Sequence, residues 1–123
     1  MNKDTAICII TYKRPIMLRK CIESILNQTY DSFELFIIDN DEDKSSERII
    51  NFMNHDSKIH IKYFNEGKKG IPFARNMGVK LIKNDYKFLT FIDSDEIADK
   101  NWLINLRKTI IKYKADVVAG PAY

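Results

Sequence analysis

Two carboxylates follow directly after an apolar run near the end of the chain. Asp93 and Asp95, separated by Ser94, come after residues 88–92, which are mostly apolar and favour a strand. On an extended chain, side chains two residues apart point to the same side, with Cβ atoms roughly 6–7 Å apart. Both carboxylates can then meet one divalent cation, directly or through water. The spacing predicts a metal site with Asp93 and Asp95 as ligands.

Further acids crowd the same segment. Glu96 and Asp99 follow the pair, and the next basic residue is Lys100. Two like charges about 4 Å apart repel by about 1 kcal/mol in water and about 4 kcal/mol at an effective dielectric near 20, so a cation would relieve the repulsion. The alternative is a turn at Asp93 and Ser94, with Asp99 as the cap of the next helix. We favour the metal for the pair and the cap for Asp99.

The bulk composition is that of a globular domain. A chain of 123 residues, 45% hydrophobic and 30% charged, is long enough to form a core and too apolar to be disordered. No apolar run reaches the length of a transmembrane segment, and the polar residues 1–4 do not form a signal peptide. The sequence therefore predicts one domain over residues 1–123, without a transmembrane segment and located in the cytoplasm.

Cysteine placement and charge exclude several classes of protein. Cys8 and Cys21 lie at apolar positions and are expected to be free thiols in a core. The net charge of +3 is spread along the chain, with no arginine-rich stripe and no zinc-finger spacing. We therefore expect no nucleic-acid partner.

Apolar runs and helical periodicity alternate along the chain, which predicts the α/β class. The expected fold is a mainly parallel twisted sheet with helices on both faces and right-handed crossovers. The expected strands are residues 6–10, 33–38, 59–64, 88–92 and 116–120. The expected helices are residues 15–27, a short helix capped by Ser45 or Ser46, residues 72–83 and residues 100–114.

Polar residues stand where these strands end. Ligands of parallel sheets bind beyond the carboxyl ends of the strands, at the point where strand order reverses. Thr11, Asp39 and Asp93 occupy such ends, and Tyr12 adds an aromatic ring. The turn after the first strand contains no glycine, so neither the dinucleotide fingerprint nor the P-loop is present. A nicotinamide dehydrogenase and an ordinary nucleoside triphosphatase are disfavoured.

Cations surround the start of the expected helix at residues 72–83. Lys68, Lys69 and Arg75 lie where the helix dipole is already positive, and a bound anion would resolve this conflict. The alternative is that Arg75 pairs with an acid such as Asp93 while both lysines are solvated. We assign the lysines to solvent and Arg75 to an anion.

Five segments stand out in order along almost the whole chain. They are residues 9–15 (IITYKRP), 21–30 (CIESILNQTY), 34–40 (ELFIIDN), 70–78 (GIPFARNMG) and 91–95 (FIDSD). Together they resemble the inverting family-2 glycosyltransferases, which have the GT-A fold and transfer sugars from nucleotide diphosphate donors. A lone D-x-D is weak evidence, whereas five segments in the right order are strong evidence.

The resemblance implies roles in donor binding. Tyr12 would stack on the base, and Thr11 would contribute a backbone or hydroxyl contact. Asp39 would accept a hydrogen bond from the ring N3–H of uracil, which cytosine lacks. Arg75 would reach the base or the diphosphate. Tyr12 as a turn aromatic and Thr11 as a helix cap remain the alternatives.

The same resemblance implies the metal and the partners. Asp93 and Asp95 would hold Mn²⁺ or Mg²⁺ against the diphosphate of the donor, which is expected to be a UDP-sugar. The acceptor would be a glycan or a lipid in polysaccharide biosynthesis. Peripheral association of a full-length enzyme with a membrane stays open.

Some features depart from the family pattern. The family often has Asn at the position of Lys13 and a Gly-Ser-like turn at that of residues 41–43, so the shape of the base pocket is less certain than the metal pair. Family members usually continue for another hundred residues or more, so we expect a donor-binding half, truncated on its C-terminal side.

No catalytic residue is predicted inside the chain. We expect the general base beyond Tyr123, because His55 and His60 flank the strand at residues 59–64 on the side where the chain enters it. Two alternatives stay open: a non-catalytic nucleotide-binding fragment, and a D-x-D phosphatase or phosphotransferase, which the chain resembles only at Asp93 and Asp95.

Overall fold

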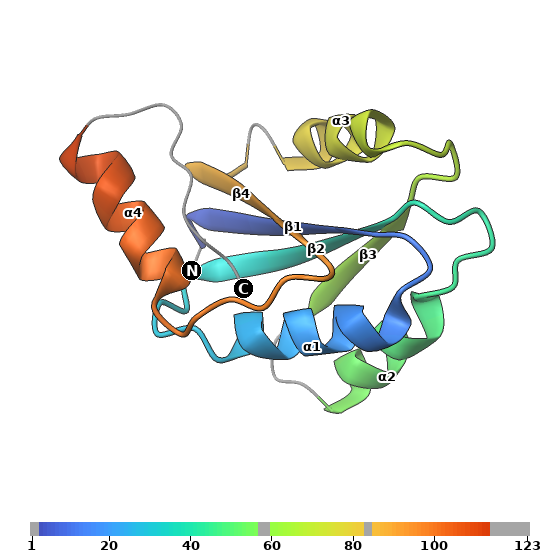
Figure 1. Ribbon diagram of the computed structural model, residues 1–123. Coiled ribbons are helices and arrows are strands. Elements are labelled where there is room, and N and C mark those ends of the chain that lie inside the picture. Colours follow the sequence, from blue (N-terminus) through green and yellow to red (C-terminus); the bar gives the residue numbers. More distant parts are fainter. Residues whose placement is uncertain (1–2, 57–59, 83–84, 114–123) are drawn as a thin grey trace.

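Strands and helices alternate along the chain, as the sequence predicts (Figure 1). The computed structural model describes residues 3–56, 60–82 and 85–113. The strands are β1 (Thr5–Thr11), β2 (Phe33–Asp39), β3 (Ile61–Asn65) and β4 (Phe88–Asp93). The helices are α1 (Pro15–Leu26), α2 (Glu47–Asp56), α3 (Ile71–Ile82) and α4 (Trp102–Lys112).

The strands described form one parallel sheet in the order β3-β2-β1-β4. From β1 the chain winds outward through β2 to β3 and then returns to the other side of β1, where it forms β4. Strand order therefore reverses at β1. The register pairs Thr11 with Asp39 and Ile10 with Asp93, so three strands end at the same edge. Such a reversal is where an open α/β sheet leaves room for a ligand.

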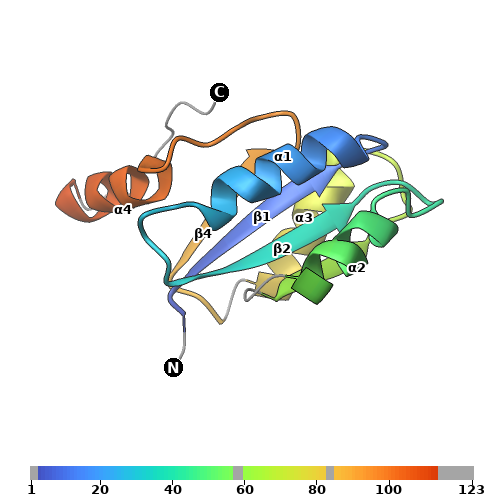
Figure 2. The same cartoon turned by 90° about the horizontal axis from the view of Figure 1, so that it is seen from below.

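Both faces of the sheet are covered, which explains why β1 and β2 are continuous apolar runs. Alternate side chains point to opposite faces. Helices α1, α2 and α4 pack on one face, and α3 packs on the other (Figures 1 and 2). On the first face lie Ile7, Ile9, Leu35 and Ile37. On the second lie Ala6, Cys8, Phe36 and Ile38.

The cysteines are core residues, as predicted. Cys8 and Cys21 are buried and free, on opposite faces of the sheet. Burial raises the pKa of each thiol to about 12, so neither is a reactive thiolate at neutral pH.

Neither Ser46 nor Asp99 is the side-chain cap predicted for its helix. Ser46 precedes α2, but its buried hydroxyl has no hydrogen-bond partner among the described residues. The residue that caps α4 is Asn101, which makes no side-chain cap hydrogen bond. Asp99 lies two residues earlier, where its Oδ1 accepts the N–H of Asn101 at 3.2 Å and its carbonyl accepts that of Trp102 at 2.9 Å. The predicted strand at 116–120 lies outside the described residues. None of the helices described is long and apolar enough to cross a bilayer.

Helix α3 lies unusually close to the sheet. Gly78 is buried in α3, and a Cβ atom there would stand 3.0 Å from Cys8 Sγ and 3.4 Å from the Phe91 ring. The missing side chain lets the helix approach β1 and β4. This close contact fixes α3, and with it the loop that precedes α3 at the strand ends.

We expect Gly78→Ala to lower the free energy of unfolding by about 1–2 kcal/mol, because overpacking against Cys8 outweighs the better helix propensity of alanine. Urea denaturation measures the change. Gly67→Ala is the control, since its Cβ would meet no atom closer than 3.7 Å. Adding Cys8→Ala to Gly78→Ala should cost less than the sum of the two changes. If Gly78→Ala is no less stable than Gly67→Ala, the close approach does not limit packing.

Candidate functional site

A pocket of about 330 Å³ lies at the carboxyl ends of β1, β2 and β4. This volume is at the lower end of the range for small-molecule sites. Its position agrees with the reversal of strand order at β1. The lining residues are Ile10, Thr11, Tyr12, Arg14, Asn40, Lys69, Gly70, Ile71, Asp93, Ser94 and Asp95.

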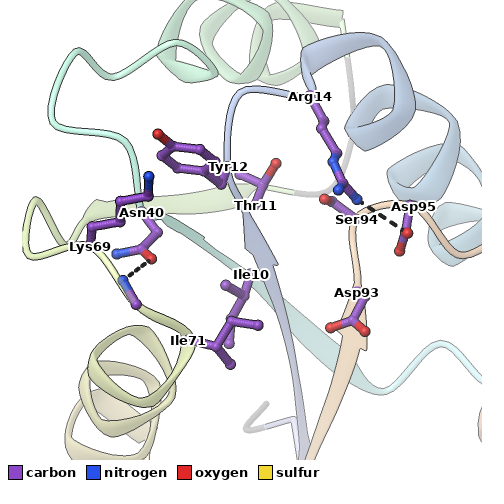
Figure 3. A pocket seen from close by; sticks show the side chains of 11 residues that line it. Ile10, Thr11, Tyr12, Arg14, Asn40, Lys69, Ile71, Asp93, Ser94 and Asp95 are labelled. Carbon is purple, nitrogen blue, oxygen red and sulfur yellow. Dashed lines mark hydrogen bonds and ion pairs between the residues drawn. The ribbon is translucent and has the colours of Figure 1, made fainter.

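The pocket has two chemically different sides, separated by the end of β1 (Figure 3). Tyr12, Asn40 and Lys69 stand on the side of β2 and α3. Asp93 and Asp95 stand on the side of β4, together with Arg14. An aromatic and amide side therefore faces a side that carries two acids and an arginine.

The D-x-D motif is on a turn, not on an extended strand. Asp93 is the last residue of β4, and its carbonyl accepts the N–H of Glu96 at 3.0 Å. In return, Glu96 Oε1 accepts the N–H of Asp93 at 3.0 Å. The extended geometry predicted for Asp93 and Asp95 was therefore wrong, and the alternative, a turn that begins at Asp93, is present. Both aspartates still line the pocket, because the turn brings Asp95 back to it.

Asp95 already has a cationic partner. Its Oδ2 lies 3.1 Å from Nη1 of Arg14, a residue that the sequence reasoning did not single out. Arg14 directly precedes α1, next to Tyr12 and Lys13, and lines the pocket. The signal that could have identified it is its position at the carboxyl end of β1, where Thr11 and Tyr12 were already singled out.

Ser24 of α1 and Gln28, two residues after the end of α1, bind the segment that follows the acidic turn. The buried Gln28 amide donates to the carbonyl of Asp99 at 2.7 Å and accepts the N–H of Leu103 at 3.0 Å. The Ser24 hydroxyl accepts the N–H of Ala98 at 3.0 Å. These bonds give irregular backbone its required partners and hold the segment against the sheet.

The carboxylates fit a divalent cation that also binds phosphate. Within the described residues, no group of three or more His, Cys, Asp and Glu side chains is arranged around a common point. Mg²⁺ is usually bound through one or two carboxylates, with waters and substrate phosphates completing its shell. The pair Asp93 and Asp95, which lines an open pocket, matches such a partial site and does not match a closed structural metal site.

Asp39 lies beside the pocket, enclosed in protein. It is fully buried, and its carboxylate accepts hydrogen bonds from Asp41 N at 3.2 Å, Ser46 N at 3.1 Å and the Tyr63 hydroxyl at 2.7 Å. Burial, together with this bond to Asp39, raises the pKa of Tyr63. Asp39 is not among the lining residues, so direct contact with a base would require displacement of a protein donor.

Asn40 is a pocket residue that the sequence reasoning missed. Its amide donates to the carbonyls of Glu66 and Lys68, both at 2.8 Å, and accepts the N–H of Gly70 at 2.9 Å. Asn40 is buried, so these bonds tie the loop before α3 to the end of β2. Its position directly after Asp39 was the available signal.

The start of α3 offers few free donors to an anion. The N–H of Gly70 is taken by Asn40, and Pro72 has none. The N–H groups of Phe73 and Ala74 bond to the carbonyl of Gly70. Arg75 is exposed, lies with its guanidinium carbon 6.0 Å from the centre of the Phe91 ring, and does not line the pocket. The structure does not bring Arg75 together with the other predicted site residues.

Tyr12 and Thr11 are at the pocket, where the sequence placed them. Two ammonium groups flank the Tyr12 ring, with Lys69 Nζ at 5.0 Å and Lys13 Nζ at 5.4 Å from its centre. The Thr11 hydroxyl is buried without a hydrogen-bond partner among the described residues, so it does not cap α1. Lys68 lies over the Phe73 ring instead, 4.1 Å from its centre.

We expect Asp39→Asn to lower the free energy of unfolding by about 1–3 kcal/mol, because an amide nitrogen would face donors that now bond to a carboxylate. Tyr63→Phe should also destabilise, since it leaves a buried acceptor without one donor. The two changes should couple, so that the double variant loses less than the sum of the singles. Chemical denaturation of the four proteins measures this. An additive result would mean that the Asp39–Tyr63 bond does not stabilise the site.

The sequence matches the family model described as Glycosyl transferase family 2 over residues 6–123. Glycosyltransferase GlyG of Streptococcus pneumoniae is 32% identical over 124 residues, which cover 100% of this chain and 40% of GlyG. The chain thus spans less than half the length of this curated relative. The phosphatase alternative, which depended on Asp93 and Asp95 alone, gains no support from these matches.

Solved structures of glycosyltransferases have the same fold as this chain. S. aureus TarS 1–349, solved in complex with UDP, has a TM-score of 0.75 at 17% identity and covers 96% of this chain, which spans 38% of that structure. Mannosyltransferase PcManGT from Pyrobaculum calidifontis, in complex with GDP-Man and Mn²⁺, has a TM-score of 0.73 at 14% identity, covering 94% of this chain and 33% of its own. At such identities these likenesses show the fold alone, which is GT-A. Together with the family match over residues 6–123, they identify the chain as belonging to glycosyl transferase family 2.

Proposed function

We propose that this chain binds the nucleotide diphosphate sugar donor of an inverting glycosyltransferase, with a UDP-sugar as the expected donor. It would be the donor-binding domain of an enzyme that uses a glycan or lipid acceptor in polysaccharide biosynthesis in the cytoplasm. A divalent cation, Mn²⁺ or Mg²⁺, would bind to Asp93 and Asp95. The part that binds the acceptor would lie outside residues 1–123.

One observation carries this proposal: the pocket has an aromatic side and an acidic side, with β1 between them. A nucleoside diphosphate has the same two-part chemistry, a flat base and a multiply charged tail. The Tyr12 ring can stack on the base, with Lys69 moving off the ring face. The Thr11 hydroxyl is buried and finds no hydrogen-bond partner in the part of the chain that the structure describes, which supports a polar ligand on this edge.

The acidic side suits the diphosphate only if a cation is present. Asp93 and Asp95 would otherwise repel the phosphates, and each is at the pocket lip where a metal can reach it. When bound, a divalent cation would neutralise the negative charge that develops on the leaving diphosphate. The chain's own contribution is to hold the two carboxylates on a fixed turn, which Glu96, Ser24 and Gln28 support.

The base side requires a revised role for Asp39. A direct bond from Asp39 to the uracil N3–H stays a prediction, because three protein donors occupy the carboxylate in this structure. Asp39 can also act indirectly, because its bonds to Asp41, Ser46 and Tyr63 fix the end of β2 from which the pocket residue Asn40 follows. Comparison of uridine and cytidine diphosphate in Asp39→Asn separates these roles, since only direct contact makes the preference for uracil depend on the acid.

We expect uridine diphosphate to bind in the micromolar-to-millimolar range, and about tenfold more tightly when Mn²⁺ is present, because a bridging cation replaces charge repulsion with attraction. Asp93→Asn should lose most of this metal dependence. Calorimetric titration of a panel of nucleoside diphosphates, with and without Mn²⁺, provides the measurement.

Asp99→Asn is the matched control for this experiment. Asp99 is an exposed acid of the same segment that does not line the pocket, and asparagine keeps an acceptor for the N–H of Asn101. The control should keep the full metal dependence. Superimposable titrations with and without Mn²⁺ in the parent protein would contradict the metal role.

We expect no appreciable sugar transfer by this chain alone, because an inverting displacement needs a general base, which typically contributes about 10²–10⁴-fold. Asp93 and Asp95 are assigned to the metal, and Glu96 is bonded to the backbone of Asp93. His55 and His60 do not line the pocket. The measurement compares the chain with a form extended at its C-terminus, on the same donor and acceptor. Comparable turnover by the chain alone, abolished by Glu96→Gln, would make Glu96 the base.

A further inference from the structure

Arg14 occupies a position that is unfavourable for the helix it precedes. It is the residue before α1, whose first turn contains no acidic residue, and a cation there opposes the positive end of the helix dipole. The preceding residue, Lys13, has a φ of 50°, a left-handed conformation that residues with side chains seldom adopt. Local conflicts of this kind concentrate at functional sites.

What holds Arg14 in place is its ion pair with Asp95, at 3.1 Å. Both side chains are about half exposed, 53% for Arg14 and 43% for Asp95. An ion pair with so much solvent contact stabilises only weakly. A divalent cation that binds Asp95 can therefore displace the guanidinium without a large cost.

The displaced arginine would keep its charge. A guanidinium cannot lose its proton in a protein, so Arg14 would stand uncompensated beside a divalent cation. The cations that line the pocket are Arg14 and Lys69, and its acids are Asp93 and Asp95, so the lining is balanced before any ligand binds. A metal upsets this balance, and an anion restores it. The fork of donors on arginine fits the oxygens of a phosphate in pairs.

We propose that Arg14 is an exchangeable counter-ion of the donor site: it pairs with Asp95 until a divalent cation takes that carboxylate, and it then binds the diphosphate of the donor. This inference rests on the proposed function, since it names a further residue of the same donor site. Arg14 would thus make a contact with the diphosphate that the family resemblance implied for Arg75, which lies away from the pocket. Metal and diphosphate thereby bind cooperatively. Metal alone leaves Arg14 without a counter-ion, and diphosphate alone is repelled by Asp93 and Asp95.

The test measures binding, without turnover, in the protein, in Arg14→Met and in Arg19→Met. Arg19 is the matched control: it is an exposed arginine of α1, 49% exposed and paired with Glu23 at 3.1 Å, and it does not line the pocket. Methionine keeps the apolar stem and removes the charge. Arg14→Met should fold, because it removes a cation from the positive end of α1.

Titrations with Mn²⁺ alone test the first half of the exchange. Arg14→Met should bind Mn²⁺ about fivefold more tightly than the parent, because the metal no longer has to displace Arg14 from Asp95. A fivefold change corresponds to the weak stabilisation expected of such an exposed ion pair. Electron paramagnetic resonance of free Mn²⁺ provides the readout. An unchanged affinity, the same change in Arg19→Met, or no Mn²⁺ binding by the parent and Arg14→Met alike would overturn the proposal.

Titrations with uridine diphosphate at saturating Mn²⁺ test the second half. Arg14→Met should bind the nucleotide about tenfold more weakly, the loss expected for one charged hydrogen-bonding partner of a phosphate. The opposite signs of the two changes distinguish an exchange from general damage to the pocket. Unaltered nucleotide affinity in Arg14→Met would refute the transfer of Arg14 to the diphosphate. If the parent binds Mn²⁺ but no nucleoside diphosphate, the proposed function fails and the transfer fails with it, whereas tighter Mn²⁺ binding by Arg14→Met would still support the pairing with Asp95.

Discussion

The position of β1 is the constraint on which the site depends. This strand is bonded to β2 along one edge and to β4 along the other, and its residues from Thr5 to Ile9 are almost completely buried. With neighbours on both edges and both faces, it cannot shift its register without exposing one side of the core. The register therefore fixes Thr11 beside Asp39 and Ile10 beside Asp93. Short loops that leave these ends inherit a fixed starting geometry, which is what a binding site on loops requires.

Hydrogen bonds from buried side chains then hold those loops in place. Asn40 and Gln28 are buried amides, and each bonds to backbone groups of a segment that has no regular structure. Asn40 attaches the loop before α3 to the end of β2. Gln28 bonds to the carbonyls of Asp99 and of Ser24 in α1, and so attaches the segment after the acidic turn to α1. Buried backbone N–H and C=O groups need hydrogen-bond partners, so replacement of either amide would leave several of these groups without one. The two walls of the pocket are thus held by bonds that cross between elements.

Most of the architecture could be predicted from the sequence, because it follows from local patterns. Apolar runs indicate strands, helical periodicity indicates helices, and their alternation leads to a parallel sheet whose carboxyl ends meet. This placed Thr11, Tyr12, Asp93 and Asp95 at one pocket. The pattern left both an extended pair and a turn at Asp93 open and could not decide between them, since the bond from the N–H of Asp93 to Glu96 depends on a side chain that reaches backward along the chain. Asn40 was missed for a related reason. Its hydrogen-bond partners lie up to 30 residues away in the sequence, and a local residue pattern cannot predict contacts over that separation.

Basic residues at a helix start do not by themselves predict an anion site. Those near α3 suggested an anion site, but the structure accommodates them differently: Lys68 lies over Phe73, Lys69 over Tyr12 and Arg75 over Phe91. Interactions with aromatic faces stabilise a cation without any ligand. At α1, where Pro15 at the first helical position made the helix start look ordinary, the same conflict involves Arg14 and is answered by Asp95. A cation at a helix start is therefore informative where the group that compensates its charge would also serve a ligand. Under the proposed metal role, Asp95, which pairs with Arg14, is such a group.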